Sequence, residues 1–189
     1  MPSSFLLTLC TKPAYRLQLG LAIFLQAARG TTSHYNVSSP LNGLLFGLMG
    51  LFIALNTALI LWAVYLVWRH RPHGPASYVW GIQLGLLLFL VGSAVGGAMI
   101  SHSGHTVDAP DGGPGLPGLG WSTRAGDLRI AHFLGLHSLQ VLPLLGWWLG
   151  RRWPRRAVLL TWLGAAAYAG LVAALFVQAS QGAPLLADR

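Results

Sequence analysis

The stretch YVWGIQLGLLLFLVGSAVGGAMIS, residues 78–101, contains no Asp, Glu, Lys or Arg. A helix that crosses the hydrocarbon core of a bilayer needs about 20 consecutive apolar residues. Helices in the core of a soluble protein rarely stay uncharged over such a length, because most of them keep one face in water. This stretch therefore predicts a membrane-spanning helix.

Three further segments have the same character, at residues 41–69, 129–150 and 156–178, with charged residues only at their ends. The composition of the 189-residue chain agrees, since 54% of the residues are hydrophobic and only 8% are charged. Soluble domains carry about 25% charged residues, so lipid must be the solvent for much of this surface. We predict an all-α transmembrane bundle with four spans, in a single membrane domain over residues 1–189.

The N-terminal region, residues 1–35, gives a weaker signal. Its apolar part, 17–28, is short, and Lys12, Pro13 and Arg16 interrupt the residues before it. We interpret the region as a fifth span, with a helix lying in the membrane interface as the alternative. The pattern of basic residues followed by an apolar run also fits a cleaved signal peptide.

The positions of the basic residues predict the orientation of the chain. They gather near residues 12–16, at 69–71 and at 151–156, beside the ends of the apolar segments. Because cytoplasmic loops are enriched in Lys and Arg, five spans in a bacterial inner membrane would place all three groups inside. The N-terminus is then cytoplasmic and the C-terminus periplasmic. The net charge of +8 thus reflects membrane topology, and we expect no nucleic-acid partner.

The longest loop, residues 102–128, then lies on the outer side. Its middle reads DGGPGLPG from 111 to 118, and the loop contains three of the four acidic residues. Glycine and proline in this density argue against a helix or a regular strand there. The loop is therefore either a flexible linker or a functional cap.

Histidines gather around this loop. His102 and His105 follow the span at 78–101 and would share a helix face if that helix continued, and His132 opens the next span. Because successive spans are antiparallel, these side chains are expected at one membrane depth, with Asp108 close in sequence. His137 lies about 7.5 Å deeper along the helix than His132, from a rise of about 1.5 Å per residue.

Several interpretations of this cluster stay open. A b-type haem for electron transfer would use one histidine from each of two helices, His102 or His105 opposite His132 or His137. A transition metal would use His102, His105, His132, Asp108 and Asp127. The same residues could instead fasten the loop by hydrogen bonds, in an accessory or scaffold subunit of a larger membrane complex. A quinone is a further candidate ligand.

The sequence lacks the common catalytic motifs. There is no His-Glu-x-x-His, no Gly-x-Ser-x-Gly and no phosphate-binding loop, so no enzymatic activity is assigned. A single cysteine, Cys10, precludes a disulfide within the chain and a cysteine-based metal cluster.

Two local features predict structure near the cluster. Asp127 is expected to cap the helix that follows it, and Arg129 to pair with Asp127, with Asp108 or with a lipid phosphate. Small residues four apart predict close helix packing along 78–101; these are the pairs Gly81/Gly85, Gly92/Gly96 and Ser93/Gly97.

The segment GDLRIAHFLGLHSLQVLP, residues 126–143, together with His105-Thr-Val and the stretch 111–117, resembles a group of uncharacterised bacterial polytopic inner-membrane proteins. The resemblance covers about a quarter of the chain closely and implies a bacterial, multi-span protein without implying an activity. A looser similarity to four-helix cytochromes of the b561 type rests only on histidines at helix ends.

Overall fold

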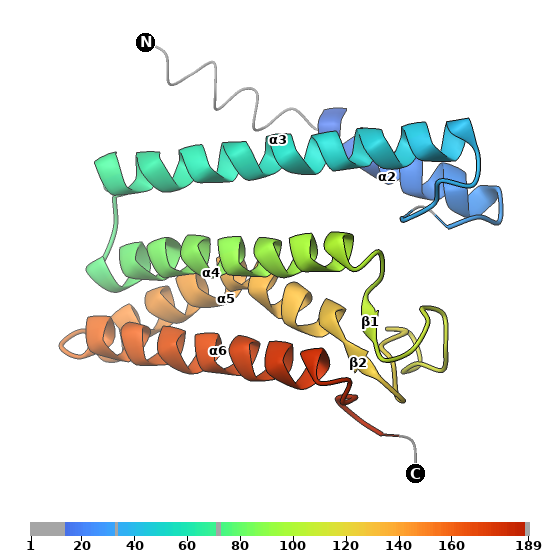
Figure 1. Cartoon of the computed structure of the whole chain (residues 1–189). Coiled ribbons are helices and arrows are strands. Elements are labelled where there is room, and N and C mark those ends of the chain that lie inside the picture. The colour runs from blue at the N-terminus through green and yellow to red at the C-terminus, as the bar shows by residue number, and fades with distance from the viewer. Residues whose placement is uncertain (1–13, 33, 71–72, 188–189) are drawn as a thin grey trace. The chain divides into compact units, whose positions relative to one another are not determined.

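Four long apolar helices dominate the computed structural model, which describes residues 14–32, 34–70 and 73–187 (Figure 1). They are α3 (Pro40–His70), α4 (Ala76–Ser101), α5 (Leu128–Arg152) and α6 (Ala157–Ser180). Even α6, with 24 residues, is about 36 Å long, which exceeds a hydrocarbon core of about 30 Å. The prediction of an all-α membrane protein with four spans is confirmed.

The predicted fifth span corresponds in part to helix α2 (Ala14–Ala28), which has 15 residues. Such a helix is about 22 Å long, shorter than the hydrocarbon core. Residues 1–13, which would have to extend it, lie outside the described residues. The crossing of the membrane by this segment therefore stays a prediction.

The described residues form two compact units, which divide between Trp62 and Ala63. In the first unit a buried polar cluster joins α2 to the start of α3. The Gln26 amide donates to Asn42 Oδ1 at 3.1 Å, and Arg29 donates to Gln26 Oε1 at 2.7 Å and to Asn42 Oδ1 at 3.1 Å. Because buried amides are costly when left without partners, this cluster fixes how the two helices meet.

In the second unit α4 and α5 are antiparallel and their backbones come into contact. A Cβ on Gly92 would lie 2.7 Å from the carbonyl carbon of Gly135, and one on Gly85 would lie 2.8 Å from the carbonyl oxygen of Ser138. Close approach through glycine is the usual means by which membrane helices gain packing energy, since lipid offers no hydrophobic driving force between them.

Serine hydroxyls add hydrogen bonds along the same contact. Ser138 Oγ donates to Gly85 O at 2.8 Å, and Ser77 Oγ donates to Gly146 O at 2.7 Å. The predicted small-residue packing is thus confirmed at Gly81/Gly85 and Gly92/Gly96, all of which meet α5. For Ser93/Gly97 the structure shows no such contact within the chain, because Gly97 faces open space, and packing there against a partner stays a prediction.

A small two-stranded sheet closes the end of the second unit, at the opposite end from the α5–α6 turn (Figure 1). Strand β1 (Thr106–Val107) pairs with β2 (Gly126–Asp127) in an antiparallel ladder that places Thr106 opposite Asp127. A further bridge joins Gly115 to Ser122. The 102–128 loop, called the cap below, is therefore a folded element and not a flexible linker.

The cap is packed onto the helices beneath it. Gly126 touches the carbonyl group of Ala179 in α6 so closely that no Cβ would fit. Below it a buried apolar cluster joins all three helices; its members are Val95, Met99, Leu128, Ala131 and Ala179.

We predict that Gly92→Ala destabilises the protein by about 1–3 kcal/mol, because the added methyl group forces α4 away from α5. Gly97→Ala, on the same helix but facing open space, is the matched control. It should be neutral or stabilising by up to about 1 kcal/mol, since alanine is the better helix former. Thermal unfolding in detergent measures both. Equal behaviour of the two variants would contradict the packing described here.

Candidate functional site

The carboxylate of Asp127 is the centre of the cap. The residue is only 1% exposed and caps α5, where its Oδ1 accepts from the backbone N–H of Arg129 at 3.0 Å. Its Oδ2 accepts from the N–H of Ser122 at 2.9 Å. The predicted capping role is confirmed. The second bond ties the segment around Ser122 to the same carboxylate.

Arg129 completes the hydrogen bonding of this carboxylate. Its Nε lies 3.0 Å from Asp127 Oδ1 and its Nη2 lies 2.6 Å from Oδ2, in a two-pronged ion pair. The same guanidinium donates to the carbonyl oxygen of Gly120 at 2.5 Å. Burial raises the pKa of Asp127, but the hydrogen bonds from Arg129 and Ser122 and the charge of Arg129 outweigh burial and hold the pKa below its ordinary value.

His105 lies on the other side of Asp127. Its Nδ1 is 3.3 Å from Asp111 Oδ1, 3.1 Å from Thr106 Oγ1 and 4.0 Å from Asp127 Oδ1. Burial, followed by the charge of Arg129, lowers the pKa of His105 despite the two carboxylates. The imidazole is therefore neutral at pH 7, and its nearness to Asp111 is a contact between a neutral ring and a carboxylate.

Asp111 folds the chain around His105. Its carboxylate accepts from the backbone N–H groups of Thr106 at 2.9 Å and of His105 at 3.2 Å. Burial raises its pKa, but hydrogen bonds from Thr106 and His105 more than compensate, and the pKa is lowered overall. Both carboxylates are thus ionised at neutral pH and serve to hold cap backbone.

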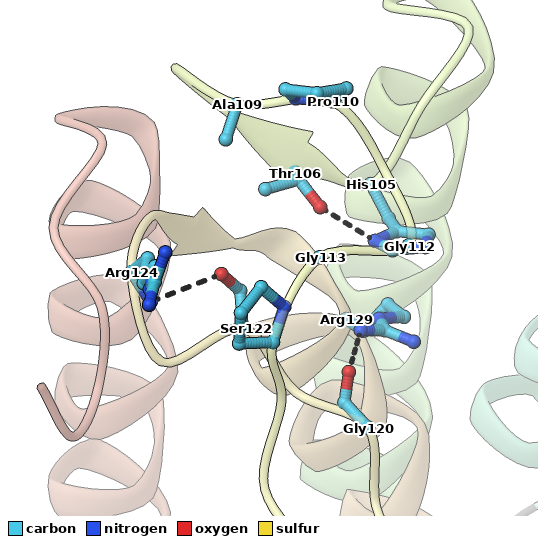
Figure 2. A pocket seen from close by; sticks show the side chains of 11 residues that line it. His105, Thr106, Ala109, Pro110, Gly112, Gly113, Gly120, Ser122, Arg124 and Arg129 are labelled. Carbon is cyan, nitrogen blue, oxygen red and sulfur yellow. Dashed lines mark hydrogen bonds between the residues drawn. The ribbon is translucent and has the colours of Figure 1, made fainter. Parts of the chain in front are cut away.

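A pocket of about 320 Å³ opens in the cap (Figure 2). It is lined both by the segment that contains His105 and by the segment that contains Ser122 and Arg124. Its titratable lining groups are His105, Arg124 and Arg129, and the hydroxyl groups of Thr106 and Ser122 lie beside them. The carboxylates of Asp111 and Asp127 are not part of the lining. The remaining lining residues are Ala109, Pro110, Gly112, Gly113, Pro114 and Gly120.

The structure brings together only some of the predicted site residues. His105 and Asp127 meet in the cap, but α4 ends at Ser101, so the shared helical face expected for His102 and His105 does not form. His102 is exposed at the C-cap of α4. Asp108 has a φ of +67° and lies against Gly182, after α6.

The two histidines of α5 lie below the cap. His132 Nδ1 is 2.7 Å from the carbonyl oxygen of Gly92, and its ring lies over Gly96, so it bridges α4 and α5. His137 Nδ1 is 2.8 Å from the carbonyl oxygen of Phe133, and its exposed ring stacks on the Phe133 ring at a centroid distance of 4.0 Å. In both rings Nδ1 must carry the proton, because the partner is a carbonyl oxygen.

Within the described residues no three His, Cys, Asp or Glu side chains are grouped so that they could hold a metal ion. Neither a family model, nor a curated protein, nor a solved structure matches this chain.

Sequence reasoning did not find Arg124, Ser122 and Thr106 as pocket residues. The sequence does show that Arg124 is a charged residue of the same loop, between the Gly/Pro-rich segment and Asp127. What could not be anticipated is the bridge between Gly115 and Ser122, which folds the loop back and creates the pocket.

We predict that the cap loses stability when the pH falls below the ordinary carboxyl range. The pKa of Asp127 is lower in the folded than in the unfolded chain, so this residue stabilises the folded cap fully above about pH 3.9. It is lost as the pH falls through the lower folded-state value. The ¹⁹F resonance of 5-fluorotryptophan at Trp121, beside Ser122, reports this transition.

The variant Asp127→Asn should lower cap stability by about 2 kcal/mol, because Asn still caps the helix but leaves Arg129 without its ion pair. Asp108→Asn is the control, since asparagine tolerates the same positive φ. An Asp127→Asn protein with an unchanged Trp121 resonance and unchanged acid stability would show that the ion pair does not hold the cap.

Proposed function

We propose that this polytopic membrane protein binds a small anionic ligand in the cap pocket. The observation that carries the proposal is the asymmetry of charge around the pocket. Its cationic lining groups are Arg124 and Arg129, beside the neutral imidazole of His105, whereas Asp111 and Asp127 are engaged with cap backbone and Arg129. A carboxylate or phosphate group entering the pocket therefore meets N–H and O–H donors.

Arg124 is the group expected to bind the anion directly. Arg129 is already held by Asp127 and Gly120, whereas the exposed Arg124 side chain has no carboxylate partner among the residues that the structure describes. A guanidinium presents a planar fork that matches a carboxylate or phosphate. The volume of about 320 Å³ falls at the small end of ordinary ligand pockets, which fits a small molecule.

We further propose that the cap faces the periplasm of a bacterial cell. The α5–α6 turn at the other end contains Arg151, Arg152, Arg155 and Arg156, and the positive-inside rule assigns such a turn to the cytoplasm. The ligand would then arrive from the periplasmic side. A binding role without catalysis agrees with an accessory subunit of a larger membrane complex.

Calorimetric titration of the detergent-solubilised protein with inorganic phosphate and with acetate tests anion binding. Arg124→Gln should weaken binding about tenfold or more, from the loss of about 1.5–3 kcal/mol in charge-assisted hydrogen bonds. Arg124→Lys, which keeps the charge but not the planar guanidinium, is the matched control and should lose less affinity for the anion. Equal affinity of wild type and Arg124→Gln, or absence of binding to either anion, would refute the proposal.

A redox cofactor on α5 is the second candidate function. The observation that favours it is the anchoring of His132 and His137, whose Nδ1 atoms face carbonyl oxygens and leave Nε2 available as a ligand. Ligating histidines in proteins are commonly oriented in this way. Because the two residues are five apart on one helix, a b-type haem would take one of them and require its other axial ligand from elsewhere.

For this second candidate we predict a Soret band in the purified protein that shifts on reduction with dithionite and is lost in His137→Ala. His137 is the better ligand because its ring is exposed, whereas His132 lies between two helices. His102→Ala serves as a control on an exposed histidine outside the span. A colourless protein without stoichiometric iron would eliminate the haem hypothesis.

A further inference from the structure

We infer that the α5–α6 turn is a docking surface for the headgroup of an anionic phospholipid. The turn reads RRWPRR over residues 151–156, and all six residues are exposed. This surface, the basic turn, lies at the end of the second unit opposite the cap (Figure 1). It is distinct from the pocket proposed above in place and in ligand.

Indole rings hold two of the guanidinium groups in position. The Arg151 guanidinium lies over the Trp147 ring at 4.3 Å, and that of Arg152 lies over the Trp153 ring at 5.3 Å. Stacking on an indole reduces the freedom of a long side chain while leaving its N–H groups directed outward. These two arginines are therefore oriented before a ligand arrives.

The indoles also place the basic turn at the headgroup level. Trp147, Trp148 and Trp153 are 43%, 50% and 43% exposed, and the last two pack edge to face at 5.2 Å. Exposed tryptophans at the ends of spanning helices settle in the interface between hydrocarbon and water. Arginines stacked on such rings are thereby held at the depth of lipid phosphates.

Among the described residues no acidic group lies near the basic turn. Within the described residues the carboxylates are Asp108, Asp111 and Asp127, and all three belong to the cap at the other end. Arg155 and Arg156 are exposed between the two helices. Four guanidinium groups without a carboxylate fit an anionic lipid better than a zwitterionic one, whose own cation would be repelled.

The full-length protein in phosphatidylcholine vesicles with a minor fraction of phosphatidylglycerol tests the proposal. Bromination of one lipid or the other reports its contact with tryptophan through fluorescence quenching. We expect brominated phosphatidylglycerol to quench more than brominated phosphatidylcholine. Each arginine is expected to contribute about fivefold to the relative association, from about 1 kcal/mol per basic residue near an anionic surface. The double variant Arg155→Gln/Arg156→Gln should therefore reduce the preference about 25-fold.

The variant Arg155→Lys/Arg156→Lys, which keeps the charge, should retain most of the preference and shows that the turn still folds. Equal quenching of the wild-type protein by the two lipids would overturn the proposal. So would displacement of phosphatidylglycerol by low concentrations of inorganic phosphate, since the surface would then bind a free anion instead of a lipid.

Discussion

A single buried carboxylate, that of Asp127, joins the parts of the cap to the helical bundle. It caps α5, accepts a hydrogen bond from the backbone N–H of Ser122 and pairs with Arg129. A charge can remain buried only when ion pairing and hydrogen bonds replace its water. The position of Arg129, and with it one wall of the pocket, follows from that requirement.

The cap also depends on the close approach of the helices beneath it. Strand β1 follows the end of α4 after the short segment 102–105, and β2 leads directly into the start of α5. The two strands can therefore pair only if those helix ends lie side by side. The contact of Gly92 with Gly135 brings the two backbones together, and His132 bridges them at the same level. In lipid, where apolar side chains gain nothing by leaving the solvent, such close packing and hydrogen bonding hold helices together.

The spans could be predicted from the sequence because length and absence of charge suffice to recognise a membrane helix. The role of Asp127 could be predicted as well, because an acid directly before an apolar helix has a local meaning. The placement of His102 and His105 could not. It depends on the end of α4 at Ser101 and on the turn at Ser103, whose φ is +54°. The pocket escaped prediction for the same reason, since it is formed by pairing between residues that are distant within an irregular loop.

Hydrogen–deuterium exchange of the backbone amides of residues 105–129, in the protein reconstituted in vesicles at neutral pH, tests the central claim that the cap is folded before any ligand binds. The N–H groups of Thr106, Ser122 and Arg129, which donate to Asp111 and Asp127, should exchange far more slowly than those of the exposed segment around Gly112 and Gly113. Exchange of all these amides at the rate of an unstructured peptide would contradict the account, because the pocket would then have no fixed walls.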